Sequence, residues 1–339
     1  MKSSIFLFLF LFIAVLVSFK SSKPNMGFEI PKGWPDPLYY FKGNEFTEDK
    51  FQLGRKLFYD PILSRDSSIS CSSCHVSFSA FAHTDHALSH GIDGRVGRRN
   101  APALINMAWN PYFHWDGSLG NIERQSMEPI RNHNEMDFNL DSAVSRLLRN
   151  KFYNGLFEKA WGDSEITVRR MLQSLAIFTS NLVSSNSKYD KIMRKERGVA
   201  FTNQEKNGYI LFKKNCASCH KEPLFSTYKL KSNGLPIDLE LKDYGHYTIS
   251  EYYKDSFLFK VPTLRNIEFT FPYMHDGRFK KLKDVLKHYA ELNPKTPYLS
   301  KELRKIKPLS SNDQKDIIAF LLTLTDKEFL YNPRYQFPR

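Results

Sequence analysis

The sequence predicts a mainly α-helical protein built from two copies of one unit. Three observations support this prediction: a cysteine–histidine motif occurs twice, the residues around it repeat, and the segment between the copies has helical apolar spacing. The copies read Cys71-Ser72-Ser73-Cys74-His75 and Cys216-Ala217-Ser218-Cys219-His220, and together they contain all four cysteines of the 339-residue chain. This arrangement indicates an internal duplication.

Both motifs have the form C-x-x-C-H, which is the attachment site of a c-type haem. In each copy the two thiols would form thioethers to the haem vinyl groups, and the adjacent histidine would be the proximal iron ligand. A zinc knuckle would need further cysteines or histidines near each motif, and no such set is apparent. The sequence therefore predicts two covalent haems in two cytochrome-c-like domains.

The repeat extends on both sides of the motifs. A helix-like stretch before each one carries a glycine and a phenylalanine four residues apart, Gly54 and Phe58 in the first copy and Gly208 and Phe212 in the second. The first copy has a longer insert, residues 59–70. Downstream, Pro102-Ala103-Leu104-Ile105-Asn106 matches Pro262-Thr263-Leu264-Arg265-Asn266, and Trp115-Asp116-Gly117 matches His275-Asp276-Gly277.

Between the two units, apolar residues at spacings of three and four predict helices over 142–150 and 167–182. We expect Asp163 and Ser164 to cap the second of these helices. The charged residues 191–198 are typical of a linker. Residues 245–253 are the one short strand candidate, and 311–325 are expected to form the last helix.

The N-terminus has the pattern of an export signal. Residues 5–17 are apolar and follow Lys2, which fits a signal-peptide core and is shorter than the roughly 20 residues of a membrane span. Because no A-x-A cleavage site follows, an uncleaved membrane anchor stays an alternative. We expect a periplasmic protein with a leader over 1–22, an N-terminal haem domain over 23–195 and a C-terminal haem domain over 196–339.

The composition constrains the partners. The formal net charge of +13 favours an acidic partner or an anionic membrane surface, although a solvated basic surface is equally compatible. No aromatic-basic nucleic-acid motif is visible, so we expect no nucleic-acid partner. A hydrophobic content of 41% is sufficient for substantial cores.

The open side of each iron decides the role of that haem. For the second haem the candidate ligands are Met274, His246, His275, His288 and Tyr289; Met274 is the one methionine after Cys219. Peroxide cleavage also needs an acid–base group near the open face. The candidates after the first motif are Glu123, Glu128, Glu135, His90 and His114, and spacing alone does not choose among them.

With these residues in place, the chain resembles the bacterial di-haem cytochrome c peroxidase family, including its MauG-type enzymes. The resemblance covers about residues 45–295. The matching residues of the first half are Arg99-Asn100-Ala101-Pro102, Trp115-Asp116-Gly117, Gln125, Pro129 and Glu135-Met136. Those of the second half are Val261-Pro262-Thr263-Leu264-Arg265-Asn266 and Tyr273-Met274-His275-Asp276-Gly277-Arg278.

The resemblance implies roles for individual residues. The haem on His75 would be the peroxidatic one, with Glu135 as the acid–base group and Gln125 beside it. Trp115 would lie between the haems and relay electrons. His90 matches the displaceable distal histidine, in a loop that also contains His83 and His86.

The resemblance also implies a calcium site formed by the Asn100 side chain and the carbonyls of Thr270 and Pro272, and oxygen donors suit this ion. His275 would be a hydrogen-bonding residue near the second haem. Where typical peroxidases have a methionine ligand to the second haem, this chain has Tyr289, as MauG-type enzymes do. A phenolate ligand would stabilise ferric iron and lower its potential.

Three functions follow as hypotheses. The first is reduction of hydrogen peroxide to water, with electrons from a small cytochrome c or copper protein that enter through the second haem. The second, which Tyr289 favours, is a MauG-like oxidation of residues in a partner protein through a high-valent di-haem state. The third is a pure electron carrier, against which Glu135 and Gln125 argue. A homodimer stays an alternative to a monomer.

Overall fold

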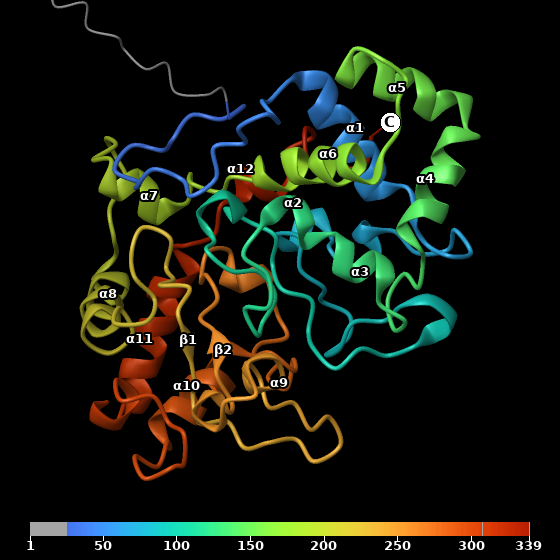
Figure 1. Ribbon diagram of the computed structural model, residues 1–339. Coiled ribbons are helices and arrows are strands. Elements are labelled where there is room, and N and C mark those ends of the chain that lie inside the picture. Colours follow the sequence, from blue (N-terminus) through green and yellow to red (C-terminus); the bar gives the residue numbers. More distant parts are fainter. Residues whose placement is uncertain (1–25, 307, 339) are drawn as a thin grey trace, which may run out of the picture.

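The computed structural model describes residues 26–306 and 308–338 and is mainly helical (Figure 1). The predicted leader, residues 1–22, lies outside this part of the chain. The first half contains α1 (Glu48–Tyr59), α2 (Ile122–Gln125), α3 (Met127–Arg131), α4 (Leu140–Leu148), α5 (Lys151–Trp161) and α6 (Val168–Ser180). The second half contains α7 (Lys188–Met193), α8 (Asn203–Asn215), α9 (Tyr247–Ser250), α10 (Leu282–Ala290), α11 (Ser311–Leu322) and α12 (Lys327–Leu330). The predicted fold class is confirmed.

Each half is organised around one close helix pair, α1 with α6 and α8 with α11. The helices that precede the two motifs begin alike, because the Thr47 hydroxyl caps α1 and the Thr202 hydroxyl caps α8. The glycine of each helix allows close contact with the helix packed against it. A β-carbon on Gly54 would collide with the carbonyl of Ser174 in α6, and one on Gly208 with that of Asp316 in α11. The sequence repeat is therefore also a repeat of packing.

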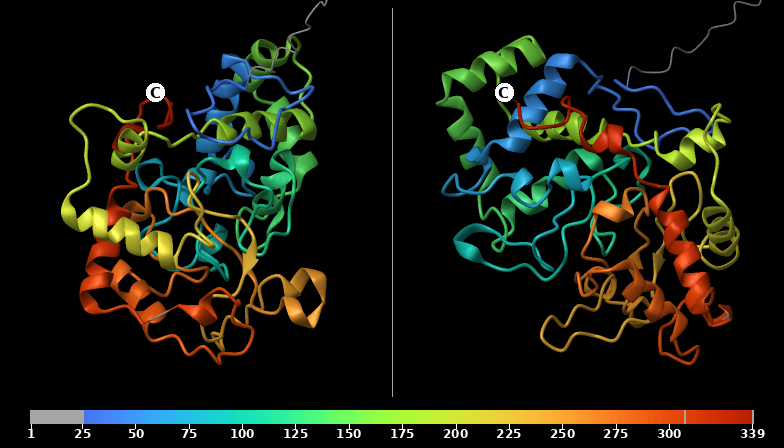
Figure 2. Two further views of the ribbon diagram at one scale, coloured as in Figure 1. Left: turned by 90° about the vertical axis from the view of Figure 1, so that its left-hand side faces the viewer. Right: turned by 180° about the vertical axis from the view of Figure 1, so that it is seen from behind.

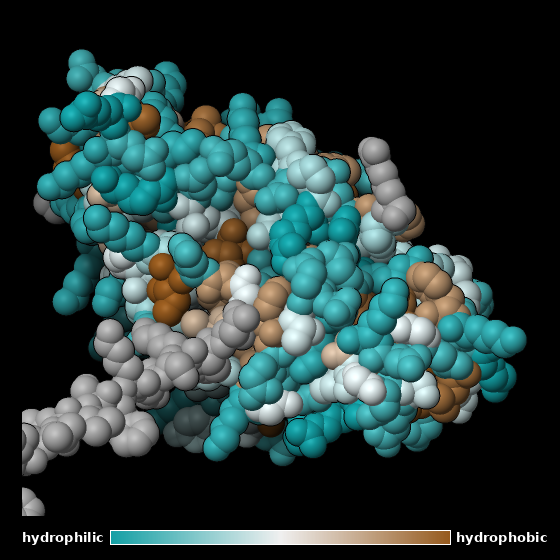
Figure 3. Space-filling view, turned by 90° about the horizontal axis from the view of Figure 1, so that it is seen from above, coloured by the Kyte–Doolittle hydropathy of each residue, from teal (hydrophilic) through white to brown (hydrophobic). Residues whose placement is uncertain are grey.

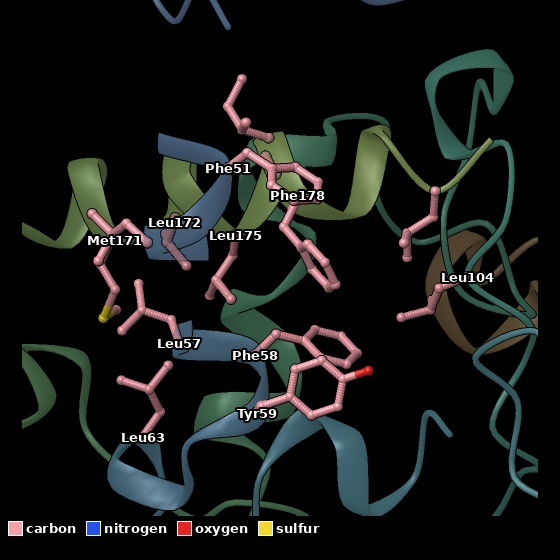
Figure 4. Close-up of a cluster of buried hydrophobic side chains, with 14 of the residues drawn as sticks. Phe51, Leu57, Phe58, Tyr59, Leu63, Leu104, Met171, Leu172, Leu175 and Phe178 are labelled. Atoms are coloured by element: carbon pink, nitrogen blue, oxygen red, sulfur yellow. The ribbon is translucent and has the colours of Figure 1, made fainter. Parts of the chain in front are cut away.

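Two hydrophobic cores correspond to the two halves. In the first, Phe51 and Phe58 of α1 pack against Phe178 of α6, with ring centroids 5.4 and 5.1 Å apart (Figure 4). In the second, Phe212 of α8 packs against Phe320 of α11 at 5.0 Å. Burial of such large apolar rings is the main favourable contribution to folding.

The end of the chain returns to the first half. Phe329 and Leu330 of α12 belong to the first core, and Figures 1 and 2 place α12 beside α6 and α1. The Tyr59 hydroxyl donates to the Tyr335 carbonyl at 2.7 Å. This return ties the two halves together beyond the loops that connect them.

Three local predictions need correction. Residues 245–253 do not form a strand: they contain α9, whose start follows Gly245 with its positive φ of 65°. The two short strands are instead β1 (Leu230–Lys231) and β2 (Phe259–Lys260), paired antiparallel. The helix from Ser311 ends at Leu322, and α12 follows it. The cap of α6 is Thr167, since Asp163 binds Arg170 instead.

The surface is mostly hydrophilic, with scattered hydrophobic side chains on the face shown in Figure 3. Within residues 26–306 and 308–338, no helix has the length and apolar character needed to cross a membrane.

Candidate functional site

In each C-x-x-C-H motif the histidine ring is held by one nitrogen, which leaves the other nitrogen available to bind a metal. Nδ1 of His75 lies 2.7 Å from the Phe81 carbonyl, and Nδ1 of His220 lies 3.2 Å from the Phe225 carbonyl. A carbonyl oxygen can only accept, so Nδ1 carries the proton and Nε2 is the nitrogen left for a metal. Burial lowers the pKa of both histidines to about 4, and the neutral imidazole is the form that binds iron.

Two cavities lie against these histidines. The His75 cavity has a volume of about 550 Å³ and is bordered by Cys71, Cys74 and His75. The His220 cavity has a volume of about 230 Å³ and is bordered by Cys216, Cys219 and His220. Free thiols, a neutral histidine and apolar walls together fit covalently attached haem. All six predicted attachment residues are thus brought together, three at each cavity.

Glu135 borders the His75 cavity as a partly buried carboxyl group. Burial raises its pKa, and a hydrogen bond of 3.0 Å from the Asn132 amide lowers it to a smaller extent. The loop at Gly91 packs directly on the Glu135 backbone, where a β-carbon would not fit. The Ile92 amide donates to the Glu135 carbonyl at 2.8 Å. Glu135 is therefore a partly buried carboxyl group with a raised pKa on a fixed backbone.

The other glutamate candidates differ in position. Glu128 borders the same cavity but is exposed. Glu123 does not border it and accepts hydrogen bonds from Asn44 and Gln173 instead. Of the three, Glu135 alone combines burial with a place on the cavity wall.

Gln125 and His114 form a second polar group on this wall. The Gln125 amide lies 3.5 Å from Nε2 of His114, whose Nδ1 lies 2.9 Å from the Ser118 hydroxyl. Gln125 ends α2, and the Asn121 side chain caps the start of that helix. Burial lowers the pKa of His114, so the ring is neutral at neutral pH and supplies one donor and one acceptor.

His90 also borders the His75 cavity, and its ring stacks on His86 with centroids 4.2 Å apart. The His90 carbonyl lies 3.4 Å from the Cys74 sulfur. The loop therefore lies beside the attachment site, and the role of His90 as a displaceable ligand stays a prediction.

Trp115 borders both cavities. Its indole N–H donates to the Asn100 carbonyl at 2.8 Å, and its own carbonyl accepts from the Lys260 amide at 2.6 Å. These bonds hold the ring in the wall that the two cavities share, and the role of Trp115 as an electron relay between two haems stays a prediction.

The candidate ligands of the second haem divide into two groups. Tyr289 of α10, Met274 and His275 border the His220 cavity. His288 and His246 do not, and they lie against the Asn233 and Asp116 carbonyls at 3.0 and 2.7 Å.

Within the bordering group, the contacts distinguish the three side chains. Burial raises the pKa of Tyr289 to about 12. The Met274 sulfur accepts a hydrogen bond of 3.4 Å from the Asn233 amide. The His275 ring stacks on Phe259 with centroids 3.8 Å apart. Tyr289 thus borders the cavity as a partly buried phenol, and its role as iron ligand stays a prediction.

Comparison with known proteins agrees with this geometry. Residues 48–198 match the profile of the family described as di-haem cytochrome c peroxidase. Methylamine utilization protein MauG of Methylophilus methylotrophus is 34% identical over 89% of this chain and 88% of its own length. The chain belongs to the di-haem cytochrome c peroxidase and MauG family. Cytochrome c551 peroxidase of Nitrosomonas europaea is 33% identical over 82% of this chain and 80% of its own.

A solved structure shares the whole architecture. The crystal structure of a MauG-like protein associated with microbial copper homeostasis has a TM-score of 0.82 at 29% identity, and covers 91% of this chain and 98% of that one. Family membership implies two c-type haems, and the two cavities fit them.

The predicted calcium ligands of this family member border one cavity: Asn100, Thr270 and Pro272 all line the His220 cavity. The Asn100 amide nitrogen donates to the Ala87 carbonyl at 3.0 Å, which leaves its oxygen as the donor for a cation. Within the described residues, no cluster of three or more histidine, cysteine, aspartate or glutamate side chains is suited to a metal ion. The calcium site stays a prediction.

Sequence reasoning missed two arginines that hold this region together. Arg99 binds Asp243 at 2.6 Å and also pairs with Asp116, so it links the halves. Arg265 is fully buried and forms two bonds to Asp190, at 2.8 and 2.7 Å. Both arginines stand in the family motifs, but Asp243 and Asp190 lie 144 and 75 residues away from them and belong to no motif, so the sequence did not reveal these pairs.

Proposed function

We propose that this protein reduces hydrogen peroxide to water at the His75 cavity. One peroxide molecule takes up two electrons and two protons and gives two water molecules. The observation that carries the proposal is Glu135, a partly buried carboxyl with a raised pKa on the wall of the cavity that His75 borders. A general acid–base group must have its pKa near the working pH, and burial moves Glu135 in that direction.

Glu135 would move a proton from one peroxide oxygen to the other. Haem bound through His75 supplies the electrons that break the O–O bond. Gln125 and His114 would orient the peroxide by hydrogen bonding, since together they offer donors and acceptors on the same wall. Glu128 borders the same cavity but is exposed to solvent, so it is the weaker candidate for this role.

Trp115 is the side chain best placed to carry electrons between the cavities, because it borders both and two hydrogen bonds fix it. We infer that the donor is a small cytochrome c or copper protein. The net charge of +13 favours an acidic donor. We also propose that the protein is exported to the periplasm and binds calcium through Asn100, Thr270 and Pro272.

The test is oxidation of a reduced small cytochrome c by peroxide, catalysed by the holoprotein with both haems attached. We expect steady turnover that needs both proteins. Absence of turnover with any small cytochrome or copper donor, in an enzyme that carries both haems, would remove the proposal.

A second candidate function is MauG-like oxidation of residues in a partner protein. Tyr289 favours it, because this partly buried tyrosine borders the His220 cavity. The relative named methylamine utilization protein MauG is also 34% identical to this chain. The decisive experiment adds peroxide to two forms of the protein, one fully oxidised and one with a single haem reduced, and records the optical spectrum of each. Peroxide changes either the spectrum of the fully oxidised form or only that of the form with one haem reduced. The first result would favour the MauG-like function and the second the reductively activated peroxidase.

A further inference from the structure

Three polar groups without partners among the described residues lie on the wall of the His220 cavity, and two of them, on Lys260 and Asn110, border the His75 cavity as well. Lys260 is 9% exposed, and across the described residues its ammonium group makes no hydrogen bond or ion pair. The Tyr228 hydroxyl and the Asn110 amide oxygen are also buried without a partner. Buried polar groups are nearly always hydrogen-bonded, so three on one wall indicate that a polar ligand occupies this place.

The charge of Lys260 indicates that the ligand is an anion. The ammonium lies 5.6 Å from the centre of the Tyr228 ring, and burial lowers its pKa to about 8. The neighbouring cations already have protein partners: Arg99 binds Asp116 and Asp243, and Lys231 binds Glu302. Lys260 is therefore the buried cation of this wall that remains available to an outside carboxylate.

We propose that Lys260 and Tyr228 bind a propionate carboxylate of the haem attached to Cys216 and Cys219. The propionates are the anionic groups of a haem, and the rest of its edge is apolar. Lys260 and Asn110 border both cavities, whereas Tyr228 borders the His220 cavity alone, and this is the observation that favours the second haem over the first. The hydroxyl donates one hydrogen bond and the ammonium supplies the opposite charge. The Asn110 amide, turned so that its nitrogen faces the cavity, adds a third donor.

This pairing has a measurable consequence. A buried positive charge beside a haem stabilises the reduced form, because reduction adds a negative charge nearby. Lys260 would therefore raise the reduction potential of the second haem. The inference requires only that the haems are attached, so it can fail while peroxide reduction stands, and the reverse is also true.

The experiment is a spectroelectrochemical titration of the holoprotein and its variants. Lys260→Met should lower the midpoint reduction potential of the second haem. The expected size is at least a tenfold change in the reduction equilibrium constant, which corresponds to about 59 mV for one electron. Lys260→Arg should stay close to the native value. Lys242→Met is the matched control, because this exposed lysine borders the His75 cavity and water screens its charge. Tyr228→Phe should give a smaller decrease than Lys260→Met.

An unchanged midpoint of the second haem in Lys260→Met would overturn the proposal, and so would a decrease confined to the first haem. If Lys260→Met does not accumulate with both haems, Lys260→Gln replaces it. The resonance Raman propionate bending bands of the native protein and Lys260→Arg give a further readout. They should differ, and identical bands would contradict the pairing.

Discussion

The two cavities share one backbone frame and differ in the side chains that line their walls. Both have a histidine held through Nδ1 by a carbonyl, and both follow a helix with a glycine at its crossing point. The His75 cavity then has Glu135 and Gln125 on its wall, whereas the His220 cavity has Tyr289. The difference teaches that duplication preserved attachment and packing while the chemistry changed on the opposite wall.

The repeat makes this contrast specific. His114 and Met274 occupy corresponding places, both with positive φ, at 60° and 77°. The residue after each is Trp115 in one half and His275 in the other. A hydrogen-bonding imidazole in the first half thus corresponds to a thioether in the second, which is consistent with peroxide binding at one cavity and electron transfer at the other.

The largest expected effect is on catalysis in the first cavity. Glu135→Gln removes the acid–base group and should lower peroxide turnover about 100-fold or more, while both haems stay attached. Glu128→Gln, on the same wall but exposed, is the control and should keep most of the activity. Steady-state kinetics with a reduced cytochrome measure both. Near-native turnover of Glu135→Gln would remove this residue from the mechanism.

The second prediction concerns a feature that only the second half has. Arg265 is fully buried against Asp190, whereas the corresponding residue of the first half is the apolar Ile105. Arg265→Met leaves a buried carboxylate without its partner and should cost about 3–5 kcal/mol of unfolding free energy. Denaturant unfolding measures this cost. The double variant Asp190→Leu with Arg265→Met should recover much of the lost unfolding free energy. This recovery would show that the loss comes from the unpaired Asp190 carboxylate.

The same pair predicts a pH dependence. Burial alone would raise the pKa of Asp190, but the bonds from Arg265 outweigh it and lower the pKa below 3.8. A carboxyl group whose pKa is lower in the folded state than in the unfolded state stabilises the protein when the pH is above the unfolded-state pKa. This stabilisation is lost as the pH falls through the folded-state pKa. The native protein should therefore lose this contribution below about pH 4, and Arg265→Met should lose less stability over that range.

The third prediction tests the shared frame. Gly54→Ala and Gly208→Ala each push a methyl group into a neighbouring helix carbonyl and should each cost about 1–3 kcal/mol. Gly155→Ala is the control, because this helical glycine of α5 has open space around it and should gain roughly 0.5–1 kcal/mol. Thermal unfolding of the three variants compares them. A large cost at one crossing and none at the other would break the equivalence of the halves.

The smallest effect is expected at Tyr289. Tyr289→Met exchanges a phenol for a thioether. On the prediction that this side chain binds iron, the reduction potential of the second haem should rise, which corresponds to about a tenfold change in its reduction equilibrium constant. Tyr289→Phe serves as the comparison that removes the oxygen alone. A midpoint that stays the same in both variants would mean that Tyr289 is a core residue.

The sequence allowed much of this account to be predicted because the relevant signals are local. The attachment motifs, the Gly54 and Gly208 spacing and the mainly helical class all follow from short patterns, as do the family motifs that led to Glu135 and Trp115. The Arg265–Asp190 pair and the unpaired Lys260 and Tyr228 depend on contacts between distant segments, which no local pattern reports. The strand expected over 245–253 was wrong because a short stretch of β-branched and aromatic residues among polar ones does not distinguish a strand from a short helix such as α9.

The most direct test of the central claim is the optical spectrum of the fully oxidised holoprotein and of the form with one haem reduced, recorded before and after peroxide. We predict a rapid change in at least one of the two states, and a change that is at least 100-fold slower in Glu135→Gln. If peroxide leaves both spectra unchanged, the His75 cavity is not a peroxide site and the protein is an electron carrier.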